Sequence, residues 1–334
     1  MGMNRRDCMK AMGATMVAAA LPSSMPFWPA LAQSKYPDRP IRVIVPYAPG
    51  GVVDVMARHW GERMKSVLGS VVIENQGGGG GTLGASNVAR ATPDGYTLLF
   101  GDTSSQIITP SLMASPPYDP VTSFAAISII ATSTPGIVVH PSVPVKDLAE
   151  FIKYAQANAD KLSYGSAGPG TVGNLAGELF KQTIKAPGIT HIPYRGAGPA
   201  FADLLAGTTP FATPNVTGQV LESHRAGKVR LLAVCGPTRL KAAPDIPAAV
   251  ESLPGMVVQL SAGVFAPAGT PQPIVLQISN ATAEAVKDPA FIRALEAAGL
   301  ETRQDASAAA AQAFLETERK RLVPVIQAAG MKAL

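Results

Sequence analysis

Short apolar runs alternate with amphipathic stretches over the N-terminal third of the chain. The apolar runs have the length and the flanking turn residues of buried strands, and they occupy residues 40–48, 71–75 and 96–101. Between them, Val53, Met56 and Trp60 recur at helical spacing. The two stretches expected to be helices are residues 52–68 and 82–91. Strands alternating with helices in this order predict a parallel sheet flanked by helices.

A second series with the same alternation begins near residue 145. Its expected strands are residues 161–166, 189–194 and 229–235, with a short apolar piece at Phe211. Its expected helices are residues 145–161, 172–182, 198–207 and 217–226. The C-terminal part has one more apolar run, at residues 259–267. Three helical patterns follow it, at residues 271–287, 289–299 and 307–330. This mostly helical part could complete the lobe that the first series begins.

Two long apolar crossings join the series, namely residues 125–141 and the region after Cys235. Two series joined in this way predict two α/β lobes, each a mixed, mostly parallel sheet flanked by helices. Lobe 1 is expected to comprise residues 35–135 and 240–334, and lobe 2 residues 136–239. Cys235 lies in an apolar run and is expected to be a buried strand residue.

Composition indicates a globular protein and limits its partners. Of the 334 residues, 47% are hydrophobic and 15% are charged, unlike the composition of disordered chains. The formal net charge is +5, and it falls to +3 once residues 1–32, with three basic residues and one acidic residue, are removed. A mildly basic protein suits an anionic ligand. Because the sequence contains no dense Lys/Arg cluster with interleaved aromatic residues, we do not expect a nucleic-acid partner.

Residues 1–32 have the pattern of a signal peptide. Arg5 and Arg6 precede a modestly apolar stretch at residues 11–21, and an A-x-A cleavage signal ends at Ala32. Prolines interrupt the apolar run well short of the ~20 residues that a membrane span needs. We therefore expect cleavage near Ala32 and a mature protein in the periplasm. The arginine pair is typical of the twin-arginine route, and the general secretion route stays open.

The first glycine motif, PYAPGGVVD at residues 46–54, follows an expected strand and opens a helix. Gly50 and Gly51 let the backbone approach a ligand, and the first N–H groups of a helix lack intrahelical partners. Such a helix start can bind an anion. Asp54 could cap the helix or contact a ligand group. The alternative is an ordinary βα turn, in which the glycines serve only the turn geometry.

The second glycine motif also lies between a strand and a helix. It reads YGSAGPGTVG and contains a literal G-x-G-x-x-G at Gly168, Gly170 and Gly173. A dinucleotide fingerprint would have an acidic residue ending the next strand, but Arg195 stands there, which could instead suit a 2′-phosphate. The other interpretation is a second carboxylate cradle, in which the hydroxyls of Ser166 and Thr171 assist the backbone N–H groups.

The segment GDTSSQ, residues 101–106, ends the third expected strand. Thr103 and Ser104 therefore stand where parallel sheets bind ligands, although hydroxyls at this place can equally cap a helix. Catalytic chemistry is not indicated. Ser166 lacks the G-x-S-x-G elbow of a nucleophile, and the four histidines show no metal-ligand spacing. One of them, His191, lies in an expected strand and is expected to be structural. We therefore expect no enzyme activity, no metal and no cofactor.

The mature chain also resembles the substrate-binding proteins of tripartite tricarboxylate transporters, the Bug receptors. The resemblance extends over essentially all of the mature chain and implies a two-lobed venus-flytrap fold with the ligand in the cleft. The segments that carry it are YPDRPIRVIVPYAPGGVVD, ENQGGGGGTLGASNVARATPDGYTLLFG, YDPVTSFAAIS, LSYGSAGPGTVGNLAGELFK, HIPYRGAGPAFADLLAG, HRAGKVRLLAV and FAPAGTPQPIV.

The resemblance further implies that two loops hold a ligand carboxylate, partly through water. The residues in these loops are Tyr47, Ala48, Pro49, Gly50, Gly51, Ser166, Ala167, Gly168, Gly170 and Thr171. The sequence departs from the family where the variable end of the ligand would lie. Asn215 follows Pro214 where the family often has an acidic residue. Asp102 replaces the usual serine and Arg195 the usual lysine, so the identity of the ligand stays open.

The expected function is reversible capture of a small carboxylate by a monomeric receptor, which delivers it to membrane permease subunits. A sensory receptor of the same fold, presenting its ligand to a sensor kinase, is the alternative, followed by an NAD(P)-binding enzyme. Candidate ligands are dicarboxylates, tricarboxylates, aromatic acids, amino acids and nicotinate-like compounds.

Overall fold

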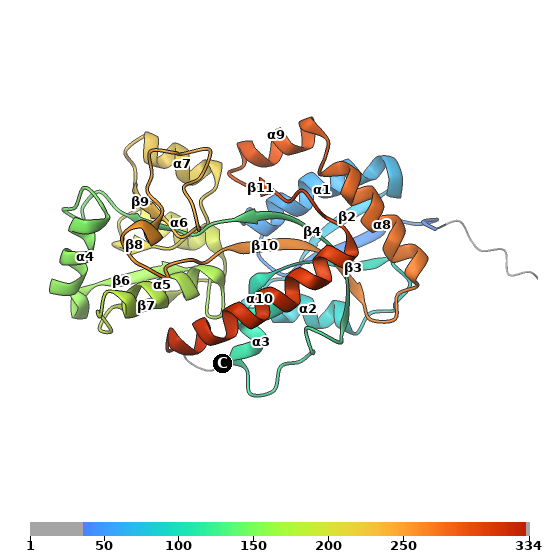
Figure 1. The fold of residues 1–334 in the computed structure, drawn as a ribbon, viewed down its shortest axis with the longest axis horizontal. Coiled ribbons are helices and arrows are strands. Elements are labelled where there is room, and N and C mark those ends of the chain that lie inside the picture. Colours follow the sequence, from blue (N-terminus) through green and yellow to red (C-terminus); the bar gives the residue numbers. More distant parts are fainter. Residues whose placement is uncertain (1–35, 332–334) are drawn as a thin grey trace, which may run out of the picture. The chain divides into compact units, whose positions relative to one another are not determined.

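The computed structural model describes residues 36–331, so the predicted signal peptide at residues 1–32 lies outside the described part of the chain. Two separate sheets, one of six strands and one of five, are each flanked by helices (Figure 1). We call the larger sheet with its helices lobe 1 and the smaller sheet with its helices lobe 2. The predicted two-lobed α/β fold is confirmed, and the predicted residue limits of the lobes stay a prediction.

The sheet of lobe 1 has the strand order β11–β4–β10–β3–β1–β2. Its strands are β1 (Ile41–Val45), β2 (Val71–Asn75), β3 (Thr97–Asp102), β4 (Phe124–Ser133), β10 (Leu260–Pro267) and β11 (Glu301–Thr302). The helices of this lobe are α1 (Val52–Leu68), α2 (Thr82–Ala89), α3 (Thr109–Leu112), α8 (Gln272–Ala285), α9 (Pro289–Ala297) and α10 (Ala308–Ala328). Strands β2 and β3 pair with β1 in parallel, so the loops that follow β1 and β3 lie at the same edge of the sheet.

The sheet of lobe 2 has the strand order β7–β6–β8–β5–β9. Its strands are β5 (Gly136–Val139), β6 (Ser163–Ser166), β7 (Thr190–Pro193), β8 (Phe211–Ala212) and β9 (Arg230–Val234). Its helices are α4 (Leu148–Ala157), α5 (Val172–Thr183), α6 (Ala197–Leu205) and α7 (Gly218–Arg225). Helices α5 and α6 follow the parallel strands β6 and β7, so both helices begin at one edge of this sheet.

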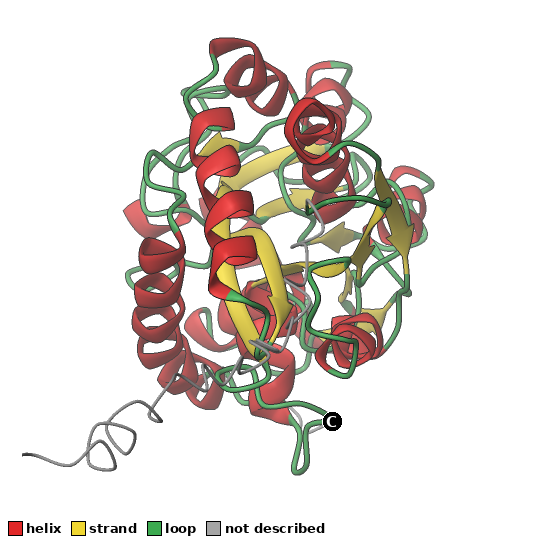
Figure 2. Ribbon diagram, turned by 90° about the vertical axis from the view of Figure 1, so that its right-hand side faces the viewer, coloured by secondary structure: helices red, strands yellow, loops and turns green. Residues whose placement is uncertain are grey.

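Each lobe has its own aromatic core (Figure 2 shows the helices packed around the strands). In lobe 1, Trp60 of α1 is buried against Phe100 of β3, and its indole N–H donates to Thr282 Oγ1 of α8 at 3.0 Å. In lobe 2, Phe151 of α4 stacks on Phe180 of α5 with ring centroids 5.5 Å apart. Burial of each such ring contributes about 1.5–3 kcal/mol. Helix α1 is therefore held on the sheet of lobe 1, and α5 is held against α4 in lobe 2.

Two segments carry the chain between the lobes and lie side by side. One is the turn from β4 to β5, and the other leads from β9 to β10. The N–H of Cys235 donates to the carbonyl oxygen of Pro135 at 2.7 Å, and the N–H of Val258 donates to that of Cys235 at 2.8 Å. A hinge motion between lobes is absorbed by a few residues at such connections.

The strand pairing differs from the mostly parallel pattern predicted. Four of the nine strand pairs are parallel and five are antiparallel, because the crossing strands β4, β5 and β10 run against their neighbours. A single π-helical turn, Ser104–Ile108, also went unpredicted. Within residues 36–331, no helix combines the length and the apolar character required to cross a membrane.

Candidate ligand-binding cleft

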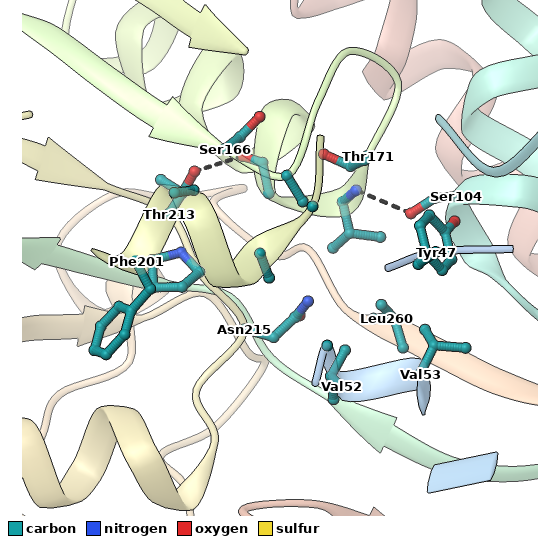
Figure 3. A pocket seen from close by; sticks show the side chains of 18 of the residues that line it. Tyr47, Val52, Val53, Ser104, Ser166, Thr171, Phe201, Thr213, Asn215 and Leu260 are labelled. Atoms are coloured by element: carbon teal, nitrogen blue, oxygen red, sulfur yellow. Dashed lines mark hydrogen bonds between the residues drawn. The ribbon is translucent and has the colours of Figure 1, made fainter. Parts of the chain in front are cut away.

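A cavity lies between the two lobes (Figure 3). Lobe 1 contributes Tyr47, Ala48, Gly51, Val52, Val53, Asp102, Ser104 and Leu260 to its wall. Lobe 2 contributes Gly165, Ser166, Ala167, Thr171, Val172, Gly173, Gly196, Ala197, Ala200, Phe201, Ala212, Thr213, Pro214 and Asn215. The cavity volume is about 50 Å³. A buried water needs roughly 10–15 Å³ on this scale, so the space suits a compact ligand.

The start of α1 presents backbone donors to this cavity. Gly51 is the N-cap, and no side chain in the described residues caps the helix. The first N–H groups of a helix lack intrahelical partners, and here they belong to Val52 and Val53 in the cavity wall. With the positive end of the helix dipole they favour an anion. A Cβ at Gly51 would meet only the carbonyl oxygen of Ala48, at 3.7 Å, so the fold itself does not require glycine there.

Asp54 holds the loop before α1 and does not face the cavity. Its carboxylate accepts hydrogen bonds at 2.9 Å from the Gly50 N–H, from Asn75 Nδ2 and from two nitrogens of Arg58. Burial alone would raise the pKa of Asp54, but these donors together lower it. The carboxylate therefore fixes the loop before α1, and a contact between Asp54 and a ligand stays a prediction.

The start of α6 faces the loop before α1 from the other lobe. Gly196 is its N-cap, again without a capping side chain among the residues described. The Gly196 N–H donates to the carbonyl oxygen of Ala167 at 3.0 Å. A Cβ on Gly196 would come within 3.3 Å of the Ala48 Cβ, which shows how closely the two loops approach. The sequence predicted this helix at residues 198–207 but not that its start faces the cavity, although it follows β7 by the same strand–loop–helix rule as the other two.

The start of α5 differs, because side chains of its own loop occupy its donors. Thr171 accepts from the Asn174 N–H at 3.3 Å and donates its hydroxyl to the Gly168 carbonyl oxygen at 2.7 Å. The N–H of Gly168 donates to Ser166 Oγ at 3.2 Å, and that of Gly170 to Asn174 Oδ1 at 3.1 Å. A dinucleotide diphosphate needs such N–H groups free. The geometry of this loop therefore does not support an NAD(P) site.

Hydrogen bonds beside the cavity join the two lobes. The N–H of Val172, the first residue of α5, donates to Ser104 Oγ at 3.1 Å (Figure 3). The Thr109 hydroxyl of α3 lies 3.0 Å from the carbonyl oxygens of both Gly170 and Gly80. Ser104 thus bonds to a helix of the opposite lobe. Opening the cleft must break these contacts.

Ser166 is hydrogen-bonded to His191, the histidine expected to be structural. Ser166 Oγ lies 2.8 Å from His191 Nε2, and the imidazole stacks on the Tyr164 ring with centroids 4.7 Å apart. Burial lowers the pKa of His191 to about 4, so the ring is neutral near pH 7. His191 does not line the cavity, so this bond draws the Ser166 hydroxyl away from a ligand. The pair supports the β6–α5 loop and does not activate a nucleophile.

Asp102 and Tyr47 form a network in the wall of lobe 1. Asp102 Oδ1 accepts from the Tyr47 hydroxyl at 2.6 Å, from the Ser105 N–H at 3.0 Å and from Ser105 Oγ at 2.9 Å. Burial, followed by the charge of Asp102, raises the pKa of Tyr47 well above its usual range, which keeps its hydroxyl a donor. Thr103 points elsewhere and exchanges hydrogen bonds with the Ser261 backbone.

The structure brings eight of the fifteen predicted ligand residues to the cavity wall. They are Tyr47, Ala48, Gly51, Ser104, Ser166, Ala167, Thr171 and Asn215, the last with its amide pointing into the cavity (Figure 3). The other seven do not line it: Pro49, Gly50, Asp54, Thr103, Gly168, Gly170 and the exposed Arg195. Their contacts with a ligand stay predictions. Across residues 36–331, no group of three or more His, Cys, Asp or Glu side chains is placed to hold a metal ion.

Residues 56–331 match the profile of the family described as "Tripartite tricarboxylate transporter family receptor". The chain belongs to this family.

BugT of Bordetella pertussis is 33% identical over 300 residues, which cover 89% of this chain and 91% of BugT. The solved periplasmic binding protein BugD is 32% identical, with a TM-score of 0.83 over 89% of this chain and 99% of BugD. A Rhodopseudomonas palustris protein solved with adipate is 31% identical, with a TM-score of 0.85 over 90% of this chain and all of that one. The resemblance to Bug receptors is confirmed, and the family is one of receptors.

Proposed function

We propose that this protein is a periplasmic receptor that binds a small carboxylate between its lobes and delivers it to a membrane permease. The observation that carries the proposal is the pair of helix starts, α1 and α6, that face the cavity from opposite lobes without a capping side chain in the described chain. Each offers N–H donors and the positive end of a helix dipole. Two such ends stabilise an anion without any basic side chain.

Family membership supports the transport role, and the adipate found with the R. palustris relative supports a carboxylate ligand. A ligand bound to both helix starts contacts both lobes at once. It therefore stabilises the closed arrangement relative to an open one by these differential contacts. We further propose a monomer that is exported with cleavage near Ala32, which N-terminal sequencing of the exported protein tests.

The decisive experiment is a thermal-shift screen over mono-, di- and tricarboxylates, followed by calorimetry on each compound that raises the melting temperature. A true ligand at about 100 times its Kd adds roughly 2.7 kcal/mol to the free energy of unfolding. The primary amide of the same acid is the matched control, because it keeps the shape of the carboxylate and loses the charge that the helix starts recognise. The proposal fails if no carboxylate binds, or if the amide binds as tightly as the acid.

A further inference from the structure

Asp102 is buried in the cavity wall with half of its hydrogen-bonding capacity unused. The residue is 2% exposed and ends β3 at the edge of the sheet that faces the cavity. Its Oδ1 accepts three hydrogen bonds, whereas Oδ2 has no partner in the described part of the chain. A buried acceptor without a partner destabilises the fold, and a charged one does so more strongly. Such a group is expected where a ligand supplies the donor.

No basic side chain in the cavity wall can pair with this carboxylate. Of the cavity-lining residues, all of which lie within residues 36–331, Asp102 is the only one with an Asp, Glu, Lys, Arg or His side chain. A ligand that carried carboxylates alone would place further negative charge beside it. Like charges at short range in a medium of low dielectric oppose binding. The wall therefore favours a ligand that also carries a cation.

Tyr47 places the carboxylate of Asp102 next to the proposed anion site. Its backbone belongs to the loop before α1, and its hydroxyl donates to Asp102 Oδ1. The donors for a ligand carboxylate and the acceptor for a ligand cation thus lie in one small cavity of about 50 Å³. A compact ligand that carries both groups fits this arrangement.

On the basis of the proposed carboxylate receptor, we propose that Asp102 selects ligands with a positively charged nitrogen beside the carboxylate, of which amino acids are the simplest. The ligand carboxylate lies at the starts of α1 and α6. An ammonium N–H of the same ligand donates to Asp102 Oδ2. The charge of the cavity and its ligand is then balanced without a lysine or an arginine.

The test uses pairs of compounds that differ only in the amino group: L-aspartate and succinate, L-glutamate and glutarate, β-alanine and propionate. Calorimetry on the exported protein should show at least one amino compound binding about 10- to 100-fold more tightly than its partner, as expected for one charged hydrogen bond. This comparison needs no variant, so it stands even if a variant fails to fold.

Asp102→Asn keeps the shape of the side chain and removes its charge. It should lower the affinity for the amino compound by about 10- to 100-fold, while the affinity for the deaminated partner stays or rises. Asp94→Asn is the matched control, because Asp94 pairs with Arg39 at the surface and does not line the cavity. It should bind both compounds as the unaltered protein does.

The outcomes separate this inference from the proposed function. Carboxylates that bind equally well with and without the amino group, or a preference that survives in Asp102→Asn, would overturn selection by Asp102 and leave the carboxylate receptor intact. Failure of every acid, with and without an amino group, would overturn the receptor proposal and this inference with it.

Discussion

The loop before α5 contains the more complete glycine motif. The starts of α1 and α6 instead have the backbone N–H groups that are more available to a ligand. In the first, the N–H groups of Gly168 and Gly170 are bonded to side chains of Ser166 and Asn174. At α1 and α6, the N-cap is a glycine with no capping side chain among the described residues. A glycine motif thus marks a tight turn into a helix. Whether an anion can bind there depends on the polar side chains that surround the turn.

The largest expected effect comes from blocking the backbone N–H groups at the start of α1. Gly51 has a φ of −74°, which valine adopts readily, and a Cβ there meets nothing closer than 3.7 Å. We expect Gly51→Val to fold normally while its methyl groups occupy the cavity, so that carboxylate affinity falls at least 100-fold, or about 2.7 kcal/mol. Calorimetry measures this loss.

Gly198→Val is the matched control for that variant. Gly198 lies in the first turn of α6, a Cβ there would meet nothing within 4 Å, and the residue does not line the cavity. The Gly198→Val variant should bind the carboxylate with the affinity of the unaltered protein. Normal binding by Gly51→Val would remove the start of α1 from the site.

The loop before α5 should respond to pH through His191, which supports it. Burial lowers the pKa of this histidine from 6.5 to about 4, so the folded state keeps the ring neutral. As pH falls from 6.5 to about 4, the unfolded chain takes up a proton that the folded chain does not. The contribution of His191 to stability is therefore complete above pH 6.5. Between pH 6.5 and about 4 the free energy of unfolding falls, by roughly 1–3 kcal/mol.

Denaturant unfolding at a series of pH values measures this decline. His191→Gln should flatten the curve between pH 6.5 and about 4, because glutamine cannot titrate. An equal slope in the variant and the unaltered protein would assign the pH dependence to other groups.

Thr171→Val tests whether the hydroxyl of the α5 loop caps the helix or contacts the ligand. As a cap, its loss should lower the free energy of unfolding by ~1 kcal/mol and change carboxylate affinity by less than about threefold. Thr183→Val, which removes a hydroxyl bonded to the Leu179 carbonyl oxygen in the last turn of α5, is the control. A loss of affinity of about tenfold would instead give the Thr171 hydroxyl a direct role in binding.

The smallest expected effect concerns the bond between Ser104 and the Val172 N–H. Ser104→Ala removes a contact made only when the lobes are closed, so ligand affinity should fall by less than about fivefold. Ser111→Ala, which removes a hydroxyl of α3 bonded to the Ile107 carbonyl oxygen in the preceding π-helical turn, should leave ligand affinity unchanged. A gain in affinity with Ser104→Ala would show that Ser104 competes with the ligand for the Val172 N–H.

Local patterns in the sequence predicted local structure well. Helix α1 spans Val52–Leu68, which the apolar spacing predicted residue for residue. The antiparallel pairing of β4 with β10 could not be predicted, because pairing depends on how distant segments meet.

The same limit applies to the candidate site. Ser104 and Val172 are 68 residues apart, so no local pattern relates them. Asp102 stood out in the sequence as a departure from the family, but its unpartnered oxygen became visible only in the folded chain.

The backbone bonds between the two crossing segments have a further consequence for redox chemistry. Cys235 lies in the segment from β9 to β10, its backbone is bonded to Pro135 and Val258, and its side chain is fully buried. Burial raises the pKa of the Cys235 thiol to about 12, so almost no thiolate forms at neutral pH. The thiolate is the form that attacks disulfides and reacts with oxidants. An accessible unpaired thiol risks covalent dimers in an oxidising compartment, and burial beside the bonded crossing segments shields Cys235 from this reaction.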